Sequence, residues 1–317
     1  MGYKTVVLNG QKMNYDGKLD FSGLSDIVTV YDDTTPEEVP DRISDADIVV
    51  TKEMPVSAEL IESFPENVRL ICEAGTGYNN IDMAAAKKKG ITVCNIPAYS
   101  SQRVAHTAVM LMLNLSSSMQ IQMSMLAKGD HSNFTDHLKV PHVELNGKVL
   151  GLIGAGNIGM EVAKVARALG MEVLIYKRHP GESTEGISYV SLEELLRKSD
   201  YISLHCPLTD ETRHLINKDT ISLMKESAFI INTSRGAVIN EADLIEALKE
   251  KRIAGAGLDV QEHEPLADDS PLYGLPNVIL TPHMGWKGLE TRQRLVRLLE
   301  KNIAAFIAGE PVNVVSK

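Results

Sequence analysis

The sequence has few cysteines, no excess of positive charge and no long apolar run. Its three cysteines, Cys72, Cys94 and Cys206, are too few and too scattered for a disulfide framework or a zinc site. Each lies in or beside an apolar run, so we expect reduced thiols and no metal centre. The most apolar helical stretch, 109–115, is too short to span a bilayer. No signal peptide is recognisable after Met1, so the expected compartment is the cytoplasm.

The charge balance also excludes classes of partner. The 32 lysines and arginines are outnumbered by 42 aspartates and glutamates, which gives a net charge of −10. Nucleic acids and anionic membranes require clustered positive charge, so neither is an expected partner. An anionic substrate would have to be bound by local cations. The length of 317 residues favours two domains, and 44% hydrophobic residues are ordinary for a globular protein.

The most informative motif in the sequence is a glycine-rich stretch. An apolar run at 149–153 predicts a buried strand, and it ends at Gly154, Gly156 and Gly159 in the spacing G-x-G-x-x-G. A helical pattern over 160–169 follows, and then a second apolar run at 172–176. This order of strand, glycine turn, helix and strand is the context that makes the motif typical of a dinucleotide site.

Each glycine has its own reason in such a site. Gly154 allows the tight turn, Gly156 allows a pyrophosphate to approach the backbone, and Gly159 allows the helix to pack on the strand. The amides of Asn157 and Ile158, at the start of the helix, would face the phosphates. The alternative is a plain turn in an α/β crossover, which the flanking pattern disfavours.

The end of the second strand indicates which dinucleotide is bound. A carboxylate near this place holds the ribose 2′-hydroxyl of NAD(H). Here the chain has Lys177 and Arg178, and no carboxylate occurs before Glu182. A cationic pair favours a 2′-phosphate, so we predict NADP(H) as the preferred cofactor, with NAD(H) possible. The alternative is that both cations only form a solvated strand end.

The chain in order predicts an α/β fold with two doubly wound parallel sheets (Rossmann/flavodoxin-like), the cofactor domain being inserted in the substrate domain. Residues 1–97 and 285–317 would form the substrate domain, and 98–284 the dinucleotide-binding domain. Strands are expected at 5–8, 27–31, 48–51, 70–73, 92–94, 149–153, 172–176, 201–205, 228–232, 255–260 and 277–280.

Three further segments are informative. The stretch 102–128 predicts one long helix whose methionines and leucines form core. Segment 130–145 holds three histidines without the spacing of a metal helix, so we expect a solvated or subunit-contact loop. The last helix, 289–308, is amphipathic and should pack on the first unit, because 285–317 has too little sheet to stand alone.

Polar residues at the carboxyl ends of strands are the catalytic candidates in the second unit. Reduction of a carbonyl by hydride needs a proton donor, and histidine suits neutral pH. A neighbouring carboxylate orients the histidine and stabilises its imidazolium, while arginine binds a substrate carboxylate in bidentate fashion. Spacing alone does not decide between the two histidines. The candidates are His205, Arg235, Asp259, Glu264 and His283.

Over nearly its whole length the chain resembles the D-isomer-specific 2-hydroxyacid dehydrogenases. The motifs that carry the resemblance are the turn 154–159, Asn-Thr-Ser-Arg-Gly at 232–236, Gly-Leu-Asp-Val at 257–260 with Glu-Pro at 264–265, and Thr-Pro-His at 281–283. Their order and spacing are highly specific. The resemblance implies an oxidoreductase that uses a nicotinamide dinucleotide.

The resemblance also assigns roles. It implies that Arg235 binds substrate, that Glu264 orients the acid and that His283 is the general acid/base. It places the amides of Thr76 and Gly77 at the substrate carboxylate. It further implies that Cys206 and Pro207 lie near the adenine, and because His205 belongs to the same turn, it becomes the weaker candidate for the catalytic histidine. The resemblance also places Thr233 and Ser234 on the ribose side of the cofactor, and Asp259 at the nicotinamide amide.

Within the family, the stretches 75–80, 94–100 and 283–286 resemble glycerate dehydrogenases, also called hydroxypyruvate reductases. They imply reduction of a small keto acid like hydroxypyruvate or glyoxylate to the D-2-hydroxy acid. D-lactate dehydrogenases share the region of Tyr99, so a D-lactate-type enzyme is an alternative. Trp286 either lines the substrate pocket or anchors a domain interface. Relatives are usually homodimers through the region that corresponds to 102–145.

Some features depart from the family or leave other classes open. His106 and Thr107 stand where relatives commonly carry an acid or glutamine followed by histidine, so an interdomain hydrogen bond is not carried over. Glu264 argues against the formate dehydrogenases. A dinucleotide-sensing, corepressor-like binding protein keeps the same three residues and is a rival, disfavoured by the absence of a basic tract or long low-complexity tails. A phosphite-type dehydrogenase is a weaker alternative.

Overall fold

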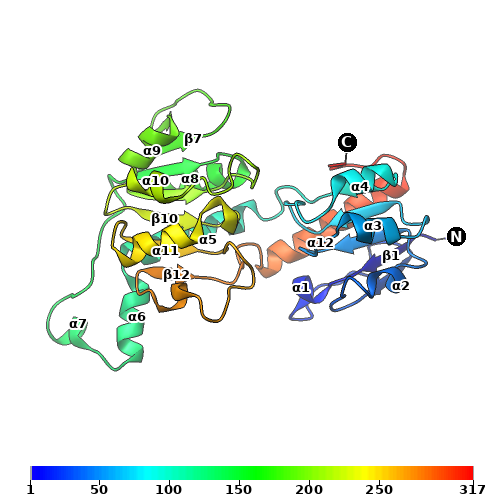
Figure 1. The fold of residues 1–317 in the computed structure, drawn as a ribbon, viewed down its shortest axis with the longest axis horizontal. Coiled ribbons are helices and arrows are strands. Elements are labelled where there is room, and N and C mark those ends of the chain that lie inside the picture. The colour runs from blue at the N-terminus through cyan, green and yellow to red at the C-terminus, as the bar shows by residue number, and fades with distance from the viewer. Residues whose placement is uncertain (1, 317) are drawn as a thin grey trace. The chain divides into compact units, whose positions relative to one another are not determined.

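The structure is a computed structural model that describes residues 2–316. These residues form one five-stranded and one seven-stranded sheet, and all neighbouring strands in both sheets are parallel. The five-stranded sheet lies in a first unit, residues 2–100 and 286–316, and the seven-stranded sheet in a second unit, residues 101–285 (Figure 1). The chain thus passes between units near residues 100 and 285.

The first unit has the strand order β2-β1-β3-β4-β5, which is the flavodoxin-like order. Buried β-branched residues fill the central strands β1 and β3, so both faces of the middle of the sheet must be covered by helices. Its strands are β1 (Lys4–Val7), β2 (Ile27–Val30), β3 (Ile48–Thr51), β4 (Leu70–Glu73) and β5 (Thr92–Cys94). Its helices are α1 (Gln11–Asn14), α2 (Val39–Arg42), α3 (Ala58–Ser63), α4 (Met83–Lys88) and α12 (Leu289–Ile307).

The C-terminal helix completes this unit. Helix α12 packs against β4, and Asn302 on its buried face donates a hydrogen bond of 2.9 Å to the Asn95 carbonyl. The apolar face of this amphipathic helix therefore packs on the sheet that the first hundred residues form. Helices α3 and α4 begin at Ser57 and Asp82, whose side chains accept hydrogen bonds from the backbone amides of the first turn.

The second unit has the strand order β12-β11-β10-β9-β6-β7-β8. Its strands are β6 (Val149–Ile153), β7 (Glu172–Tyr176), β8 (Ile187–Tyr189), β9 (Tyr201–Leu204), β10 (Phe229–Asn232), β11 (Gly255–Leu258) and β12 (Val278–Leu280). Its helices are α5 (Ser101–Ser116), α6 (Met119–Ala127), α7 (Ser132–Thr135), α8 (Asn157–Ala168), α9 (Leu192–Lys198), α10 (Lys218–Ser222), α11 (Glu241–Lys249), η1 (Gly236–Val238) and η2 (Pro271–Gly274).

Strand β6 is the point where the order of this sheet reverses. It pairs with β7 on one side and with β9 on the other, and β7 and β9 follow it in the chain. Apolar side chains cover both faces of the sheet: α5 and α8 pack on one face, and α9, α10 and α11 pack on the other (Figure 1). This is the doubly wound arrangement that the sequence predicted, in which ligands bind at the carboxyl end of the reversal.

Every predicted strand is present, with its ends shifted by at most two residues. Strand β8 and helix α10 were not expected. Strand β8 has only three residues and lies at the edge of its sheet, so its local apolar pattern is weak. Within residues 2–316 no helix combines the length and the apolar character needed to cross a membrane.

The prediction of one long helix over 102–128 is wrong. The structure has two helices, α5 and α6, separated at Ser117 and Ser118. Ser118 adopts the left-handed backbone conformation, with φ of 49°, and its Oγ donates 2.7 Å to the Pro141 carbonyl. A serine hydroxyl that bonds backbone outside the helix competes with helix continuation, and this explains the break.

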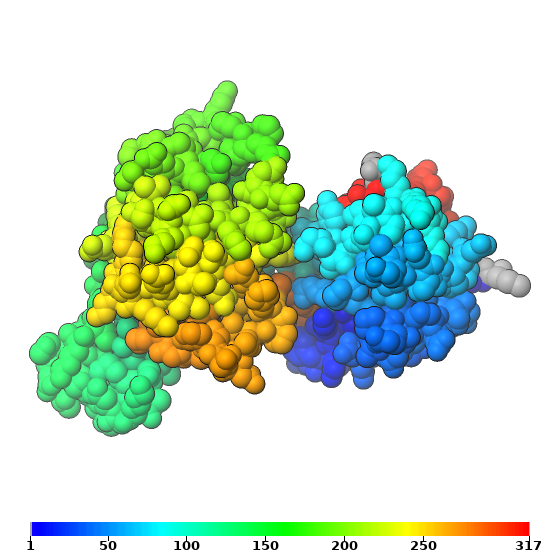
Figure 2. All heavy atoms as spheres, in the orientation of Figure 1, coloured from blue at the N-terminus to red at the C-terminus, as the bar shows by residue number. Residues whose placement is uncertain are grey.

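The prediction that the apolar face of this stretch is core holds only for α5. Helix α6 buries none of its residues, and Met123 is 58% exposed. Phe134, in α7, is 77% exposed. Figure 2 shows the segment that contains α6 and α7 standing out from the rest of its unit. These apolar side chains have no core of their own unit to pack against.

Candidate active site

The glycine turn lies at the carboxyl end of β6, beside the point where the sheet reverses. Gly154 has φ of +92°, and a Cβ there would lie 2.7 Å from the amide nitrogen of Cys206. A Cβ at Gly159 would lie 2.5 Å from the Gly154 carbonyl oxygen. Both positions therefore require glycine for the packing of the turn itself.

Gly156 differs from these two glycines. A Cβ there would meet no atom within 4 Å, so its position opens onto free space. Gly156 is the N-cap of α8, and no side chain caps the first amides of this helix, at Asn157 and Ile158. Open space in front of uncapped helix amides suits the pyrophosphate of a dinucleotide, because the amides and the helix dipole favour an anion. The residues present thus fit the predicted cofactor.

His205 follows β9, the strand that pairs with β6, and its backbone lies against this turn. Its Nε2 lies 2.9 Å from the hydroxyl of Ser203, and its enclosed Nδ1 has no hydrogen-bond partner among residues 2–316. Burial lowers the pKa of His205 to about 4. This imidazole is neutral at physiological pH, so it cannot serve as a protonated general acid. The assignment of the general acid to His283 stays a prediction, which the burial of His205 favours.

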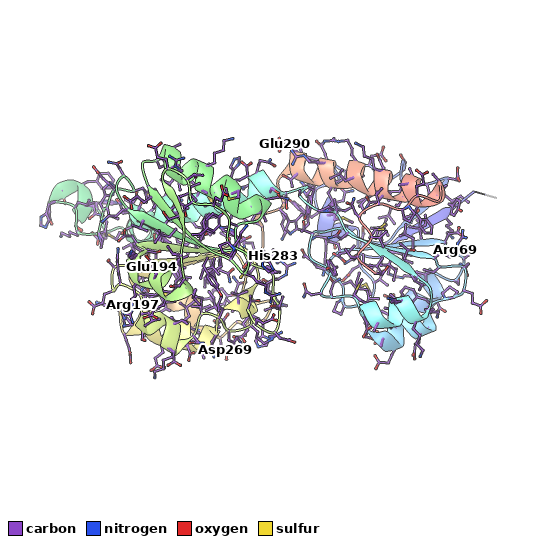
Figure 3. The ribbon with its side chains drawn as sticks, turned by 90° about the horizontal axis from the view of Figure 1, so that it is seen from above. Arg69, Glu194, Arg197, Asp269, His283 and Glu290 are labelled. Carbon is purple, nitrogen blue, oxygen red and sulfur yellow. The ribbon has the colours of Figure 1, made fainter. Side chains whose placement is uncertain are left out.

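His283 lies at the carboxyl edge of the seven-stranded sheet, three residues beyond the end of β12 (Figure 3). Its Nδ1 is 2.8 Å from Oε2 of Glu264. The other oxygen of that carboxylate accepts a hydrogen bond of 3.1 Å from the Gln261 amide. The carboxylate is therefore fixed at both ends, and it orients an imidazole that is 23% exposed.

A buried aspartate holds the turn that carries His283. Asp259 is 1% exposed, and its carboxylate accepts from the Thr281 hydroxyl and from the amides of Met284 (2.9 Å) and Gly285 (2.8 Å). Its carbonyl accepts from the His283 amide at 2.8 Å. His283 has φ of 46°, a conformation that needs such support. The role of Asp259 at the nicotinamide amide remains a prediction.

Arg235 lies in the turn after β10, and Asn232 builds this turn. Asn232 Nδ2 donates 2.9 Å to the Arg235 carbonyl, and its Oδ1 accepts from the amide (3.0 Å) and the hydroxyl (2.9 Å) of Ser234. A Cβ at Gly236 would lie 1.8 Å from the Gln261 carbonyl oxygen. The turn of Arg235 is thus pressed against the loop that leads to Glu264.

The hydroxyls expected on the ribose side differ in their partners. Ser234 uses its hydroxyl within the turn, whereas the buried Thr233 Oγ1 has no hydrogen-bond partner in the described part of the chain. The sequence analysis did not assign a role to Asn232. Its position at the end of a buried strand, three residues before a predicted arginine, was the available signal, because asparagine commonly fixes such turns.

The two cations predicted for a 2′-phosphate follow β7. Lys177 Nζ lies 5.5 Å from the centre of the Tyr189 ring. Arg178 Nη2 lies 3.2 Å from Oε1 of Glu211, and both side chains are well exposed. Such an exposed pair contributes little free energy, so Glu211 is a weak competitor for this guanidinium.

In the first unit, the turn 75–77 follows β4. The Ile96 amide donates 2.8 Å to the Gly75 carbonyl, and Asn95 Nδ2 donates 2.7 Å to the Thr76 carbonyl. Within residues 2–316, neither the Thr76 amide nor the Gly77 amide donates a hydrogen bond. Two adjacent unpaired amides in a rigid turn suit a carboxylate.

The structure also shows the positions of the other residues that the sequence singled out, Trp286, Thr107 and His106. Trp286 is 4% exposed in the first unit, with its ring against the ammonium of Lys52 at 4.0 Å. Thr107 is buried and its hydroxyl bonds Arg103, while His106 is exposed. Within residues 2–316, no group of three or more His, Cys, Asp or Glu residues could hold a metal ion.

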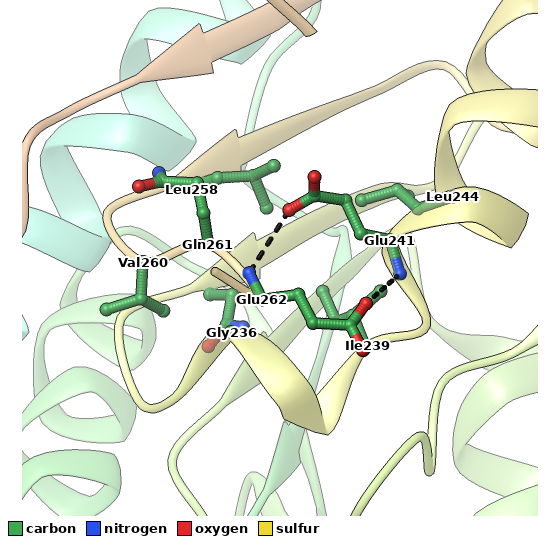
Figure 4. Close-up of a pocket in the computed structure, with 9 residues that line it drawn as sticks. Gly236, Ile239, Glu241, Leu244, Leu258, Val260, Gln261 and Glu262 are labelled. Carbon is green, nitrogen blue, oxygen red and sulfur yellow. Dashed lines mark hydrogen bonds between the residues drawn. The ribbon is translucent and has the colours of Figure 1, made fainter. Parts of the chain in front are cut away.

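A small, open hollow lies beside η1 and α11. Glu241 and Glu262 line it, and each donates its amide to the other's carboxylate at 3.1 Å (Figure 4). Two carboxylates disfavour an anionic substrate, so this hollow is not the candidate active site.

Comparison with known proteins identifies the family. The profile of the D-isomer specific 2-hydroxyacid dehydrogenase NAD binding domain matches residues 109–285. The chain belongs to this family. It is 43% identical over 323 residues to the hydroxypyruvate reductase of Blautia hydrogenotrophica, covering 99% of this chain and 100% of that one. The family acts on small hydroxy and keto acids with a nicotinamide dinucleotide, and the predicted family, enzyme class and fold are confirmed.

Solved structures with the same fold support this family assignment. A D-lactate dehydrogenase from Aquifex aeolicus, complexed with NAD and lactic acid, has a TM-score of 0.84 at 31% identity, with 99% of each chain covered. An acyclic imino acid reductase in complex with NADPH and D-Arg has a TM-score of 0.84 at 32% identity, covering 98% of this chain and 99% of that one. A dinucleotide of either kind is therefore compatible with this fold.

Proposed function

We propose that this dehydrogenase reduces a small 2-keto acid of the hydroxypyruvate or glyoxylate kind to the D-2-hydroxy acid. His283 and Glu264 carry the proposal, because they form a 2.8 Å pair on a turn that Asp259 holds in place. The relationship to the hydroxypyruvate reductase supports the substrate class. When bound, the reduced dinucleotide supplies a hydride to the carbonyl carbon of the keto acid.

The protein's own residues supply the proton. Because His283 Nδ1 is engaged by Glu264, the opposite ring nitrogen, Nε2, is the one that donates to the carbonyl oxygen. Loss of that proton leaves a neutral imidazole, which Glu264 still orients. In the oxidative direction the neutral imidazole takes the hydroxyl proton as a general base.

Cations and amides position the substrate in this proposal. Arg235 binds the carboxylate of the keto acid and polarises its carbonyl group, as a guanidinium fork suits both tasks. The Thr76 and Gly77 amides donate to the same carboxylate. The position of Trp286 against Lys52 supports its assignment to the substrate side.

We further propose that NADP(H) is the preferred cofactor, with NAD(H) also accepted. Gly154, Gly156 and the start of α8 hold the pyrophosphate, and the segment Cys206-Pro207 holds the adenine side. Lys177 and Arg178 follow β7, the place where NAD(H) enzymes carry a carboxylate. A 2′-phosphate displaces Glu211 from Arg178, because a doubly charged phosphate is the stronger partner.

A panel of keto acids run with both reduced cofactors tests these proposals. Hydroxypyruvate, glyoxylate and pyruvate are compared by kcat/KM with NADPH and with NADH. Highest values for hydroxypyruvate or glyoxylate with NADPH support the proposal, while preference for pyruvate indicates a D-lactate-type enzyme. Tight dinucleotide binding without turnover of any keto acid favours the corepressor-like sensor. Turnover of phosphite favours a phosphite-type dehydrogenase.

We also propose a homodimer, joined through α6, α7 and the loop up to residue 145. The apolar side chains of this segment are exposed on their own unit and are those that a second copy would cover. They are Met119, Met123, Leu126, Phe134, Leu138 and Val143. Light scattering at several concentrations tests this, and Phe134→Asp together with Met123→Lys should yield a monomer.

The cytoplasm is the compartment we propose. Cys72, Cys94 and Cys206 are free thiols in the structure, and free thiols persist in a reducing compartment. Fractionation of cells that express the protein tests this assignment directly.

A further inference from the structure

A buried charged pair lies at the carboxyl ends of β3 and β4, and the reaction proposed above does not use it. Lys52 follows β3 and is 2% exposed, and Glu73 ends β4 and is fully buried. Burial of two charges costs free energy unless each has close partners. The burial of both side chains therefore needs an explanation, and we look for it in their contacts around the turn 75–77.

Glu73 is held by three donors. Its Oε2 accepts from the Thr51 hydroxyl and from Asn80 Nδ2, both at 2.9 Å, and its Oε1 accepts from the Glu53 amide at 3.0 Å. Burial raises the pKa of Glu73, while Lys52 and these donors act in the opposite direction without cancelling the shift. The carboxylate is rigidly placed at the base of the turn.

Lys52 carries its ammonium over an aromatic ring. Its Nζ lies 2.5 Å from Glu53 Oε1 and 4.0 Å from the centre of the Trp286 ring. Burial acts to lower the pKa of Lys52, but Tyr99, Glu53 and Glu73 outweigh it, so the pKa is raised above its ordinary value. The ammonium is therefore charged at every physiological pH, and the π face of Trp286 stabilises it.

Both charged ends reach the backbone of Gly75. A Cβ at this residue would lie 3.3 Å from Lys52 Nζ and 3.3 Å from Glu73 Oε1. The next two amides along the chain, those of Thr76 and Gly77, are the ones without hydrogen-bond partners. The Lys52 ammonium and the Glu73 carboxylate thus both lie at the residue that precedes these two amides, and all these groups belong to one unit.

We propose that Lys52 is a positioning residue that raises the affinity of the turn 75–77 for the carboxylate of the substrate. Its field adds to that of the two amides in surroundings of low dielectric, where a charge acts more strongly than in water. Glu53 and Trp286 hold the ammonium beside Gly75. This inference rests on the proposed function, since it takes the carboxylate of the keto acid as the bound anion.

The first experiment replaces the charge with a neutral chain of similar length. Lys52→Met should raise the KM for hydroxypyruvate about tenfold, the size expected for loss of one charge-assisted interaction. It should leave kcat and the Kd for NADPH within about twofold of wild type, because neither chemistry nor cofactor is touched. Lys88→Met is the matched control, since Lys88 is an exposed lysine of the same unit, and its KM should be unchanged.

A second variant separates charge from structural support. Lys52→Met leaves Glu73 buried without its cation, which can destabilise the unit. The double variant Lys52→Met with Glu73→Gln removes both charges, so its melting temperature should lie closer to wild type. If the double variant keeps the raised KM, Lys52 acts by its charge. If it regains the wild-type KM, Lys52 only neutralises Glu73 and the inference is overturned.

Calorimetry with oxamate keeps this inference distinct from the proposed function. Oxamate carries the carboxylate of a keto acid but is not reduced, and it is titrated into the protein with NADPH present. Weaker binding by Lys52→Met, about tenfold, supports the inference even if no keto acid is turned over, in which case the proposed function alone fails. Equal binding by both proteins, or none by wild type, overturns the inference whatever the activity.

Discussion

The Nδ1 atom of His283 lies 2.8 Å from Oε2 of Glu264, although the two residues come from different loops, 19 residues apart in the chain. A second pair in the same unit has the same chemistry: His214 Nε2 lies 2.6 Å from Glu262 Oε1. The two pairs differ in their support. His283 sits on a turn held by the buried Asp259, whereas Glu262 belongs to the pair of glutamates that bond each other's amides.

This contrast gives a controlled test of the acid. His283→Ala should lower kcat for keto acid reduction about a hundred- to ten-thousandfold, because the positioned proton donor is lost. His214→Ala removes the imidazole of the other pair and should leave kcat near wild type. Steady-state kinetics of both variants with hydroxypyruvate and NADPH measure the difference. Near-normal turnover by His283→Ala would remove the acid role from this residue.

The cofactor preference is tested at Arg178 and at its partner. Arg178→Ala should raise the KM for NADPH about tenfold or more while leaving that for NADH unchanged, since only NADPH carries the 2′-phosphate. Glu211→Gln frees the guanidinium and should lower the KM for NADPH about two- to threefold. Arg197→Ala, at another exposed ion pair of the same unit, is the control. Equal effects of Arg178→Ala on the two cofactors would contradict a phosphate role.

A substitution at Gly156 should affect cofactor binding much more than stability. A Cβ there meets no atom within 4 Å, so Gly156→Ala should cost about 1 kcal/mol of stability or less. It fills the space in front of the helix amides, so the affinity for a dinucleotide should fall at least about tenfold. Gly274→Ala, also in open space but in η2, should change neither. Fluorescence titration with NADPH and thermal unfolding supply the two readouts, and unimpaired binding by Gly156→Ala would place the pyrophosphate elsewhere.

The buried His205 makes stability depend on pH. Its pKa is lowered to about 4 by burial, whereas an unfolded histidine titrates near about 6.5. Between these values the unfolded state binds the additional proton, so the free energy of unfolding falls as the pH drops from about 6.5 towards 4. The loss that this residue contributes should reach roughly 2–3 kcal/mol by pH 4.5.

Urea unfolding at several pH values checks this, with His205→Gln as the comparison. The variant lacks the titrating ring, so the difference in unfolding free energy between the two proteins should change over the acidic range and stay constant above neutrality. A constant difference at every pH would mean that His205 titrates alike in both states. His214 and the exposed histidines are common to both proteins and cancel.

The sequence predicted the repeating features well, because local physics dictates them. Buried strands, the glycine turn and the helix starts at Ser191 and Asn240 depend on residues close together in the chain. The break at Ser118 was missed because its cause, the Pro141 carbonyl, lies 23 residues away. The exposed face of α6 was missed because an apolar stripe has the same pattern whether it meets a core or another surface.

By itself the sequence determined the order of the described strands except β8, the place of the glycine turn and the short set of candidates for catalysis. Only the tertiary structure decided the surroundings of those candidates. It enclosed His205 and paired His283 with Glu264, and it brought Lys52 beside Gly75. The physical reason is that protonation and charge depend on burial and on neighbours, and these come from segments that meet only when the sheets have formed.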